Sequence, residues 1–251
     1  MTYDCLSFYN ELDMLDFRLH HVYDHVDKIV IVESDRTYAG KPCESNLIKH
    51  WDRYKWAKDK IIHSMVGLKS HPVDRWQNEA IQRNGFLQGL DIKDDDVVFL
   101  SCVDEIIRTD LYDLITAPVS ACLVLDTYYY YFNGKDVGTN PKHPMPIVFS
   151  GPCQYPHELW NDRHQLLTIP DAGWHFSYLG GVDMIKQKLE AFSHIEYDTD
   201  DVKDNLVDNI VEGRDIFGRP DHEFEFVPID DSFPTYLIHN QYKYRDFIHE
   251  T

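Results

Sequence analysis

Short apolar runs alternate with amphipathic stretches through the first half of the chain, and this alternation constrains the fold more than any other feature. The apolar runs lie at 3–8, 28–32, 60–66 and 97–100. Each is short and unbroken, as buried parallel strands are. From Leu12 to Val26 apolar residues instead recur every three or four positions, which predicts a helix. The pattern predicts an α/β fold with an open, mainly parallel sheet flanked by helices.

The second half of the chain carries weaker signals. It is punctuated by Pro144, Pro146, Pro152 and Pro156. Pro-rich stretches of this kind predict a loop-rich region. Helices are expected over 182–192 and 201–212, and the ring-rich segment 121–132 predicts a strand or a hairpin. We expect a single domain over residues 1–251, made of a first half, 1–115, and a loop-rich second half, 116–251.

The balance of charges narrows the range of partners. The chain carries 43 acidic against 24 basic residues, a net charge of −19. Binding to nucleic acid or to anionic lipid needs a basic surface, so neither is expected. An anionic substrate such as a nucleotide diphosphate would need a metal cation or a local cluster of Lys and Arg to offset the repulsion.

Targeting signals and reactive-site motifs are missing from the sequence. No apolar run approaches the ~20 residues that cross a bilayer, and the N-terminus lacks a signal-peptide pattern. The five cysteines are scattered and suggest reduced thiols. We therefore expect a soluble, cytoplasmic protein. The chain also lacks the phosphate-binding loop of P-loop enzymes, the dinucleotide-binding glycine turn and the hydrolase nucleophile elbow.

Polar residues follow two of the predicted strands directly. Glu33 and Ser34 come after the 28–32 run, and Asp104 and Glu105 come soon after the 97–100 run. In open α/β sheets the ligand lies at the carboxyl ends of the strands. Two carboxylates there could hold Mg²⁺ or Mn²⁺, which prefer oxygen ligands. The same local pattern also fits a helix cap or a solvated turn.

Two further groups of residues, Arg83 with Asn84 and the single His175, could bind a ligand or could have a purely structural role. Arg83 and Asn84, on the polar side of a predicted helix, could reach a phosphate or a sugar hydroxyl, or form a surface ion pair. His175 lies between two bulky rings, Trp174 and Phe176, and could be a metal ligand or a core histidine.

Several segments, taken in order, resemble glycosyltransferase family 17, the family of β-1,4-mannosyl-glycoprotein N-acetylglucosaminyltransferase. The matching segments are Asn10–Leu15 with Arg18-Leu19, Val32–Ser34 with Thr37, Gly40 and Pro42, Trp76 with Arg83, Asp96–Ile106, Ala172–Ser177, and Pro234 with Tyr236-Leu237 and Tyr244-Arg245. Their order and spacing span almost the whole chain. The resemblance implies a GT-A-like fold, a UDP-sugar donor, assistance by Mn²⁺ or Mg²⁺, a glycan acceptor and inversion at the anomeric carbon.

The resemblance also implies roles for residues of this chain. The metal would be held by Asp104, with Glu105 and His175 in support. The first half would bind the nucleotide sugar through Glu11, Glu33, Ser34, Arg83 and Asn84. The second half would bind the acceptor, with Glu158 or Asp171 as the general base.

One position departs from the family pattern. Where the family has Asp-x-Asp-Glu, this chain has Cys102-Val103-Asp104-Glu105. A thiol is a poor ligand for a hard cation, so metal binding could be weakened or shifted toward Mn²⁺. The expected reaction is GlcNAc transfer from UDP-GlcNAc to a glycan hydroxyl. The alternatives are a transferase that uses another UDP-hexose and a glycan- or nucleotide-binding protein that has lost catalysis.

Overall fold

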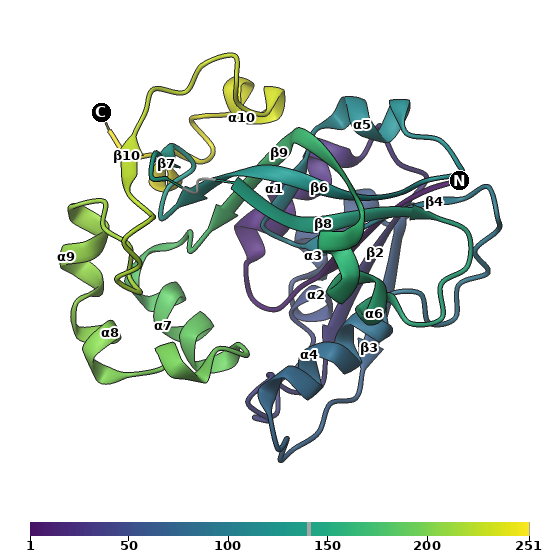
Figure 1. Ribbon diagram of the computed structural model, residues 1–251, viewed down its shortest axis with the longest axis horizontal. Coiled ribbons are helices and arrows are strands. Elements are labelled where there is room, and N and C mark those ends of the chain that lie inside the picture. The colour runs from purple at the N-terminus through teal and green to yellow at the C-terminus, as the bar shows by residue number, and fades with distance from the viewer. Residues whose placement is uncertain (140–141, 251) are drawn as a thin grey trace.

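The computed structural model describes residues 1–139 and 142–250, which form a curled open sheet with helices on both faces (Figure 1). The strands are β1 (Thr2–Ser7), β2 (Lys28–Ser34), β3 (Ile61–Val66), β4 (Val97–Cys102), β5 (Glu105–Ile107), β6 (Ser120–Tyr129), β7 (Gly134–Asp136), β8 (Lys142–Ser150), β9 (Leu167–Ser177) and β10 (Phe224–Phe226). Their order is β10-β7-β6-β8-β4-β1-β2-β3, and β9 pairs with β5 and β6 off this path.

The helices are mostly short. They are α1 (Leu12–Val22), α2 (Asn46–Lys49), α3 (Trp51–Tyr54), α4 (Arg75–Asn84), α5 (Thr109–Leu114), α6 (Pro156–Asn161), α7 (Gly181–Ala191), α8 (Asp200–Asp204), α9 (Leu206–Val211) and α10 (Thr235–His239), with 3-10 turns η1 (Lys55–Ala57), η2 (Asp162–Gln165), η3 (Ile195–Tyr197) and η4 (Arg245–Phe247). The single helix expected over 201–212 is two helices, α8 and α9. The side chain of Asn205, between them, donates to the Asp201 carbonyl at 2.8 Å, a local bond that competes with helix continuation.

The parallel part of the sheet is confirmed for the first half of the chain. Strand β1 lies between β4 and β2, β2 pairs with β3, and all three pairings are parallel. Figure 1 shows these strands running side by side through the centre of the molecule. Because they are parallel, the carboxyl ends of β1, β2 and β4 meet at one edge of the sheet.

The expectation of a mainly parallel sheet is wrong from β4 onward, and part of the proline-punctuated stretch expected to be loop is a long strand, β8. Strand β8 runs antiparallel to both β4 and β6, and β9 runs parallel to β6 and antiparallel to β5. The two prolines that indicated a loop, Pro144 and Pro146, lie within β8 itself. The register of β8 with β4 begins only at Ile147, so the prolines lie where β8 has lost that neighbour and the missing N–H groups cost little.

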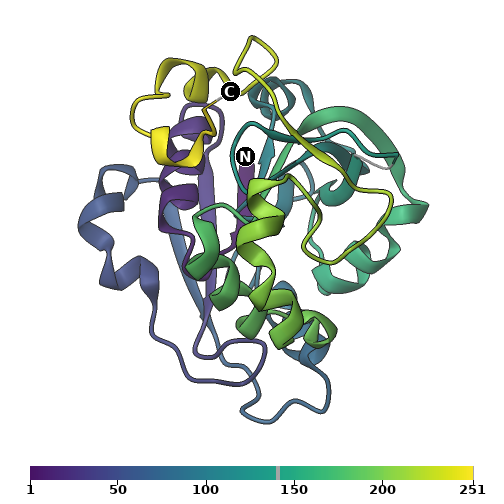
Figure 2. The ribbon, with the colours of Figure 1, turned by 90° about the vertical axis from the view of Figure 1, so that its left-hand side faces the viewer.

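The core is divided by the sheet into two main clusters. Alternate residues of β4 point to opposite faces, so that Phe99 packs in one cluster and Val98 in the other. Helix α1 covers the first face together with the C-terminal segment, which Figure 2 shows lying beside α1. The hydroxyl of Tyr244 donates to Asp16 of α1 at 3.0 Å, a buried bond that joins the two ends of the chain.

Candidate active site

A buried arginine positions the acidic turn, the segment from Cys102 to Glu105 that follows β4. Arg18 of α1 is fully buried. Its guanidinium donates to the backbone carbonyl oxygens of Cys102, at 2.6 Å, and Glu105, at 2.9 Å. Since both ends of the turn are tied to the same rigid group, the position of Asp104 between them is fixed. Arg18 belongs to a segment that resembles the family, but nothing in the sequence indicated this role.

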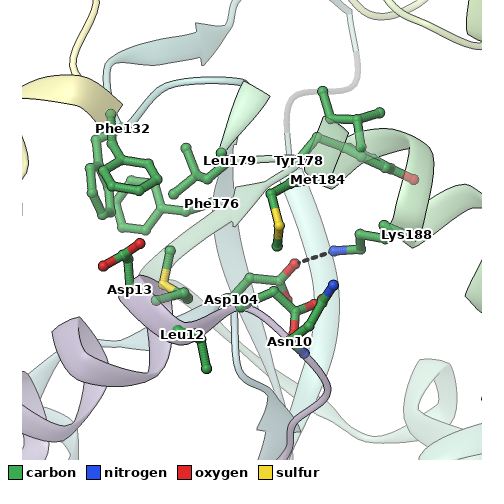
Figure 3. Close-up of a pocket in the computed structure, with 15 residues that line it drawn as sticks. Asn10, Leu12, Asp13, Asp104, Phe132, Phe176, Tyr178, Leu179, Met184 and Lys188 are labelled. Atoms are coloured by element: carbon green, nitrogen blue, oxygen red, sulfur yellow. Dashed lines mark hydrogen bonds and ion pairs between the residues drawn. The ribbon is translucent and has the colours of Figure 1, made fainter. Parts of the chain in front are cut away.

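Asp104 faces a cavity of about 200 Å³ between the start of α1 and the segment that leads into α7 (Figure 3). Phe132 and Phe176 lie together on one side of this cavity, away from Lys188. Glu11 also lines it. Apolar rings opposite hydrogen-bonding groups suit a sugar, which has apolar faces and a polar rim.

The charge of Asp104 is balanced by Lys188 of α7. The Lys188 ammonium donates to Asp104 Oδ2 at 2.7 Å, the contact drawn in Figure 3. Burial by itself would raise the pKa of Asp104. The Lys188 ammonium and His175 outweigh that effect and hold this pKa well below its usual range. Asp104 is therefore an anion at neutral pH, although its side chain is only 8% exposed.

Glu105 is held by hydrogen bonds on both carboxylate oxygens. Its Oε2 accepts the Cys102 N–H at 2.6 Å, and its Oε1 accepts a bond from His143 Nε2 at 3.0 Å. Burial opposes the ionisation of Glu105, but the bond from His143 holds its pKa below the usual value. Burial, with the neighbouring His175, lowers the pKa of His143 to about 4. His143 is thus neutral at pH 7, and it was not among the predicted residues.

His175 lies beside this group, as the sequence predicted. Its ring stacks on that of His143, with centroids 3.9 Å apart. Its Nε2 lies 3.8 Å from Asp104 Oδ2, too far for a hydrogen bond. Gly173 lets β9 approach β5 at this point, because a Cβ there would lie 2.0 Å from the Ile106 carbonyl oxygen. This close approach explains why the signature around His175 contains a glycine.

The three predicted metal ligands are therefore neighbours, but they do not fit a resident divalent ion in this arrangement. Both oxygens of Glu105 are occupied, and one oxygen of Asp104 is bound to Lys188. Within residues 1–139 and 142–250 there is no group of three or more His, Cys, Asp or Glu side chains arranged to hold a metal. A cation at Asp104 would have to displace the Lys188 ammonium.

Of the predicted nucleotide-binding residues, Glu11 lines the cavity and two others are bound within the protein. Glu33 is buried, and its carboxylate accepts bonds from Ser45 at 2.5 Å, the Asn46 N–H at 2.6 Å and His63 at 2.9 Å. Ser34 donates to the carbonyl of Arg36 at 2.7 Å. These contacts give both Glu33 and Ser34 a structural task in the loop after β2.

The two predicted residues at the end of α4 lie on the opposite face of the sheet from the cavity. Arg83 is buried, pairs with Glu79 at 2.5 Å and packs over the ring of Trp160. Asn84 accepts the backbone N–H of His157 at 3.0 Å and so ties α4 to α6.

The predicted general bases lie outside the cavity. Glu158 is exposed in the first turn of α6. Asp171 has a positive φ of 51° on β9 and forms an ion pair with Lys142 at 3.1 Å, with its own side chain 79% exposed. Their catalytic roles stay predictions.

The fold and this site define an α/β protein with a cavity at the carboxyl ends of parallel strands, lined by carboxylates that follow β1 and β4. Residues 1–247, nearly the whole chain, match the model of glycosyltransferase family 17. The chain belongs to this family and is a glycosyltransferase, which implies a nucleotide-sugar donor and an acceptor. Among curated proteins, no match to the chain is found. In the part of the chain that the structure describes, no helix has the length and apolar character to span a bilayer.

Proposed function

We propose that the chain moves a sugar, GlcNAc from UDP-GlcNAc, onto a glycan hydroxyl with inversion, on a GT-A-like fold. The observation that carries this proposal is the position of Asp104. It lies at the carboxyl end of β4, is charged, and faces a cavity lined by aromatic rings. Family membership supports the reaction class, and the shape and chemistry of the cavity support a sugar as its occupant.

Inverting transfer is a single in-line displacement. The acceptor oxygen forms a bond to the anomeric carbon while the bond from that carbon to the diphosphate oxygen breaks. The hydroxyl proton passes to a general base, and the charge that develops on the departing diphosphate is stabilised by nearby cations. Lys188 is a fixed cation beside Asp104.

Glu11 is the carboxylate best placed to act as the general base. It lines the cavity, and its Oε2 accepts the N–H groups of Tyr9 and Asn10 at 3.3 and 3.1 Å. Those bonds fix the carboxylate and leave Oε1 to meet a hydroxyl group. The earlier predictions, Glu158 and Asp171, would have to reach the acceptor from outside the cavity.

Assistance by Mn²⁺ or Mg²⁺ stays a prediction, as does the cytoplasmic location. The carboxylate oxygens of the acidic turn are mostly occupied by protein donors. A metal ion would supply positive charge to the leaving diphosphate. Measuring turnover with Mn²⁺ and with a chelator separates metal-dependent from metal-independent transfer.

The test is the release of UDP from UDP-GlcNAc, first with water and then with a panel of oligosaccharide acceptors. UDP-glucose and UDP-galactose, run in parallel, report the choice of sugar. We expect slow hydrolysis with water and faster turnover with a suitable glycan. If UDP raises the melting temperature but no donor releases UDP with any acceptor, the alternative of a binding protein without catalysis gains support.

A further inference from the structure

The backbone of the acidic turn is bound by protein donors. The carbonyl oxygens of Cys102 and Glu105 accept hydrogen bonds from the Arg18 guanidinium, and the carbonyl oxygen of Asp104 accepts the Phe176 N–H at 2.9 Å. These bonds join the turn to α1 and to β9. A divalent ion such as Mg²⁺ or Mn²⁺ needs oxygen ligands that are free to approach it. The carbonyl oxygens of these three residues are instead engaged by protein groups.

The side chains of the turn leave little more for a metal ion. Both carboxylate oxygens of Glu105 accept hydrogen bonds from protein groups, and Asp104 Oδ2 accepts the Lys188 ammonium at 2.7 Å. Cys102 places a thiol where the family pattern has an aspartate, and a thiol is a poor ligand for a hard cation. The cation that the Asp104 carboxylate does bind is the ammonium of Lys188.

The Lys188 ammonium is held in one place and still has donors to offer. Its Nζ lies 5.1 Å from the centre of the Tyr178 ring, within the range of a cation–π contact. Ile185 and Leu189 of the same helix are buried, which anchors α7. Asp104 takes one of the three N–H donors of the ammonium. Because Lys188 lines the cavity, the other donors can meet a ligand there.

The layout of the cavity places a leaving group beside this ammonium. Phe132 and Phe176 lie on the side away from Lys188 (Figure 3). A sugar whose apolar face packs on these rings has its polar edge toward Lys188 and Asp104. The diphosphate of a nucleotide sugar is bonded directly to the anomeric carbon. With the anomeric carbon at that edge, the diphosphate therefore lies within reach of the ammonium.

We propose that the Lys188 ammonium takes the place of the divalent ion and stabilises the departing diphosphate of the nucleotide sugar. This inference rests on the proposed function. As the bond from the anomeric carbon to the diphosphate oxygen breaks, its electron pair stays on that oxygen. Lys188 donates hydrogen bonds to the phosphate oxygens and keeps its protons, while the proton of the acceptor hydroxyl passes to Glu11. Lys188 is then a catalytic residue, and Asp104, which holds the ammonium, is a positioning residue.

The other charges around the cavity make the hydrogen bonds from Lys188 important. Asp13 also lines the cavity, and the Arg53 guanidinium offsets its charge. Helix α1 begins at the cavity, and the N–H groups of its first turn form its positive end. A divalent ion on Asp104 would leave one net positive charge there, whereas the ammonium leaves none. Stabilisation of the diphosphate therefore depends on the hydrogen bonds from Nζ, with the helix end in support.

The first experiment measures UDP release from UDP-GlcNAc by the full chain, stripped of metal, in EDTA and in Mn²⁺. We expect the rate of the parent in EDTA to be within twofold of its rate in Mn²⁺. Lys188→Gln should lower kcat in EDTA at least 100-fold and change KM less, because the hydrogen bonds to the leaving group are strongest in the transition state. Lys186→Gln removes the same charge from a position of α7 outside the cavity and should stay within twofold of the parent.

The second experiment does not depend on turnover. Mn²⁺ alone, followed by its EPR signal, should find no tight site in the parent. Lys188→Gln should bind Mn²⁺ at least tenfold more tightly, because Asp104 Oδ2 is freed. UDP should raise the melting temperature of the parent equally in EDTA and in Mn²⁺. The melting curve also shows whether Lys188→Gln is folded.

Three outcomes overturn the proposal. The parent loses turnover in EDTA and regains it with Mn²⁺, the parent binds Mn²⁺ as tightly as Lys188→Gln does, or folded Lys188→Gln keeps the kcat of the parent in EDTA. If Lys188→Gln does not fold, the turnover and the melting temperatures of the parent decide. If no donor releases UDP with any acceptor, the proposed function fails. An equal rise of the melting temperature with UDP in EDTA and in Mn²⁺, lost in Lys188→Gln, then still supports Lys188 as the ligand of the diphosphate.

Discussion

Two ion pairs hold the acidic turn, and they differ in how far they are buried: the side chains of Arg18 and Asp4 are 1% and 0% exposed, while those of Lys188 and Asp104 are 26% and 8% exposed. Arg18 and Asp4 are fully buried, and every contact is internal: Arg18 bonds both oxygens of Asp4 and also the Ser101 hydroxyl. The Tyr112 hydroxyl donates to Asp4 as well, at 2.9 Å. This pair is closed to ligands.

The pair of Lys188 and Asp104 is open by comparison. A single contact at 2.7 Å joins the two groups, and both line the cavity. A closed pair that satisfies all its donors stabilises one conformation of the turn, while an open pair keeps donors for a substrate. The difference teaches that the first pair fixes the acidic turn, while the second remains accessible from the cavity, where we propose that the substrate binds.

The largest expected effect comes from breaking the closed pair. Arg18→Met should lower the free energy of unfolding by about 3–5 kcal/mol, because it leaves Asp4 as a buried, uncompensated charge and two turn carbonyls without donors. Urea unfolding measures this loss. Arg108→Met, at an exposed ion pair with Asp110, should change stability by under about 0.5 kcal/mol. A loss below about 1 kcal/mol for Arg18→Met would show that the closed pair is not structural.

Lowering the pH should reduce the free energy of unfolding through the buried side chain of His21. Burial lowers the pKa of His21 to about 4, and its Nε2 bonds to the Ile107 carbonyl at 2.8 Å. The unfolded chain takes up this proton near pH 6.5 and the folded chain only near 4, so stability falls as the pH drops through that window. The lowered pKa of His21 should account for roughly 3 kcal/mol of the free energy of unfolding that is lost across this window. His143 has a similarly lowered pKa and contributes with the same sign.

Unfolding measured at several pH values checks the share of His21. His21→Gln keeps a donor for the carbonyl and removes the titration, so the slope between pH 6.5 and 4 should become shallower but not vanish. His71→Gln, at an exposed loop position, should leave the slope unchanged. Equal slopes for parent and His21→Gln would contradict the assignment.

The open pair should affect activity more than stability. Asp104→Asn should lower kcat/KM for UDP-GlcNAc at least 100-fold, which corresponds to about 2.7 kcal/mol, because the charge that holds Lys188 is lost. The free energy of unfolding should fall by less than for Arg18→Met, since the freed ammonium is 26% exposed and the new amide carries no charge. Steady-state UDP release and thermal unfolding give the two values. Asp110→Asn is the exposed control, and a variant that loses stability but keeps kcat/KM would reverse the comparison.

The strands of the first half of the chain could be predicted from the sequence, and with them the edge of the sheet at which the site lies. Unbroken apolar runs indicated β1, β2, β3 and β4, and the carboxyl end of β4 follows from them. It did not predict β8, because Pro144 and Pro146 indicate a loop unless the neighbouring strand is known to have ended.

Sequence patterns also could not select the lysine of the site. Helix α7 carries Lys186 and Lys188 on different sides of its buried stripe, and only the contact of α7 with the acidic turn shows which of them meets Asp104. Glu33 was predicted to bind the nucleotide, and this stays a prediction; the structure shows a contact that the sequence did not indicate, because the Glu33 carboxylate accepts bonds from Ser45 and Asn46 of the neighbouring loop. Tertiary contacts, which local patterns do not encode, decide both cases.

The smallest expected effect concerns the general base. Glu158→Gln should change kcat/KM less than twofold, because this side chain is exposed on α6 and lies outside the cavity. Glu11→Gln, the same change within the cavity, should lower kcat at least tenfold, because the amide cannot accept the acceptor's proton. Its effect on KM for the donor should be small if Glu11 acts on the acceptor alone. If Glu158→Gln instead abolishes turnover while Glu11→Gln is active, the acceptor binds over α6, outside the cavity.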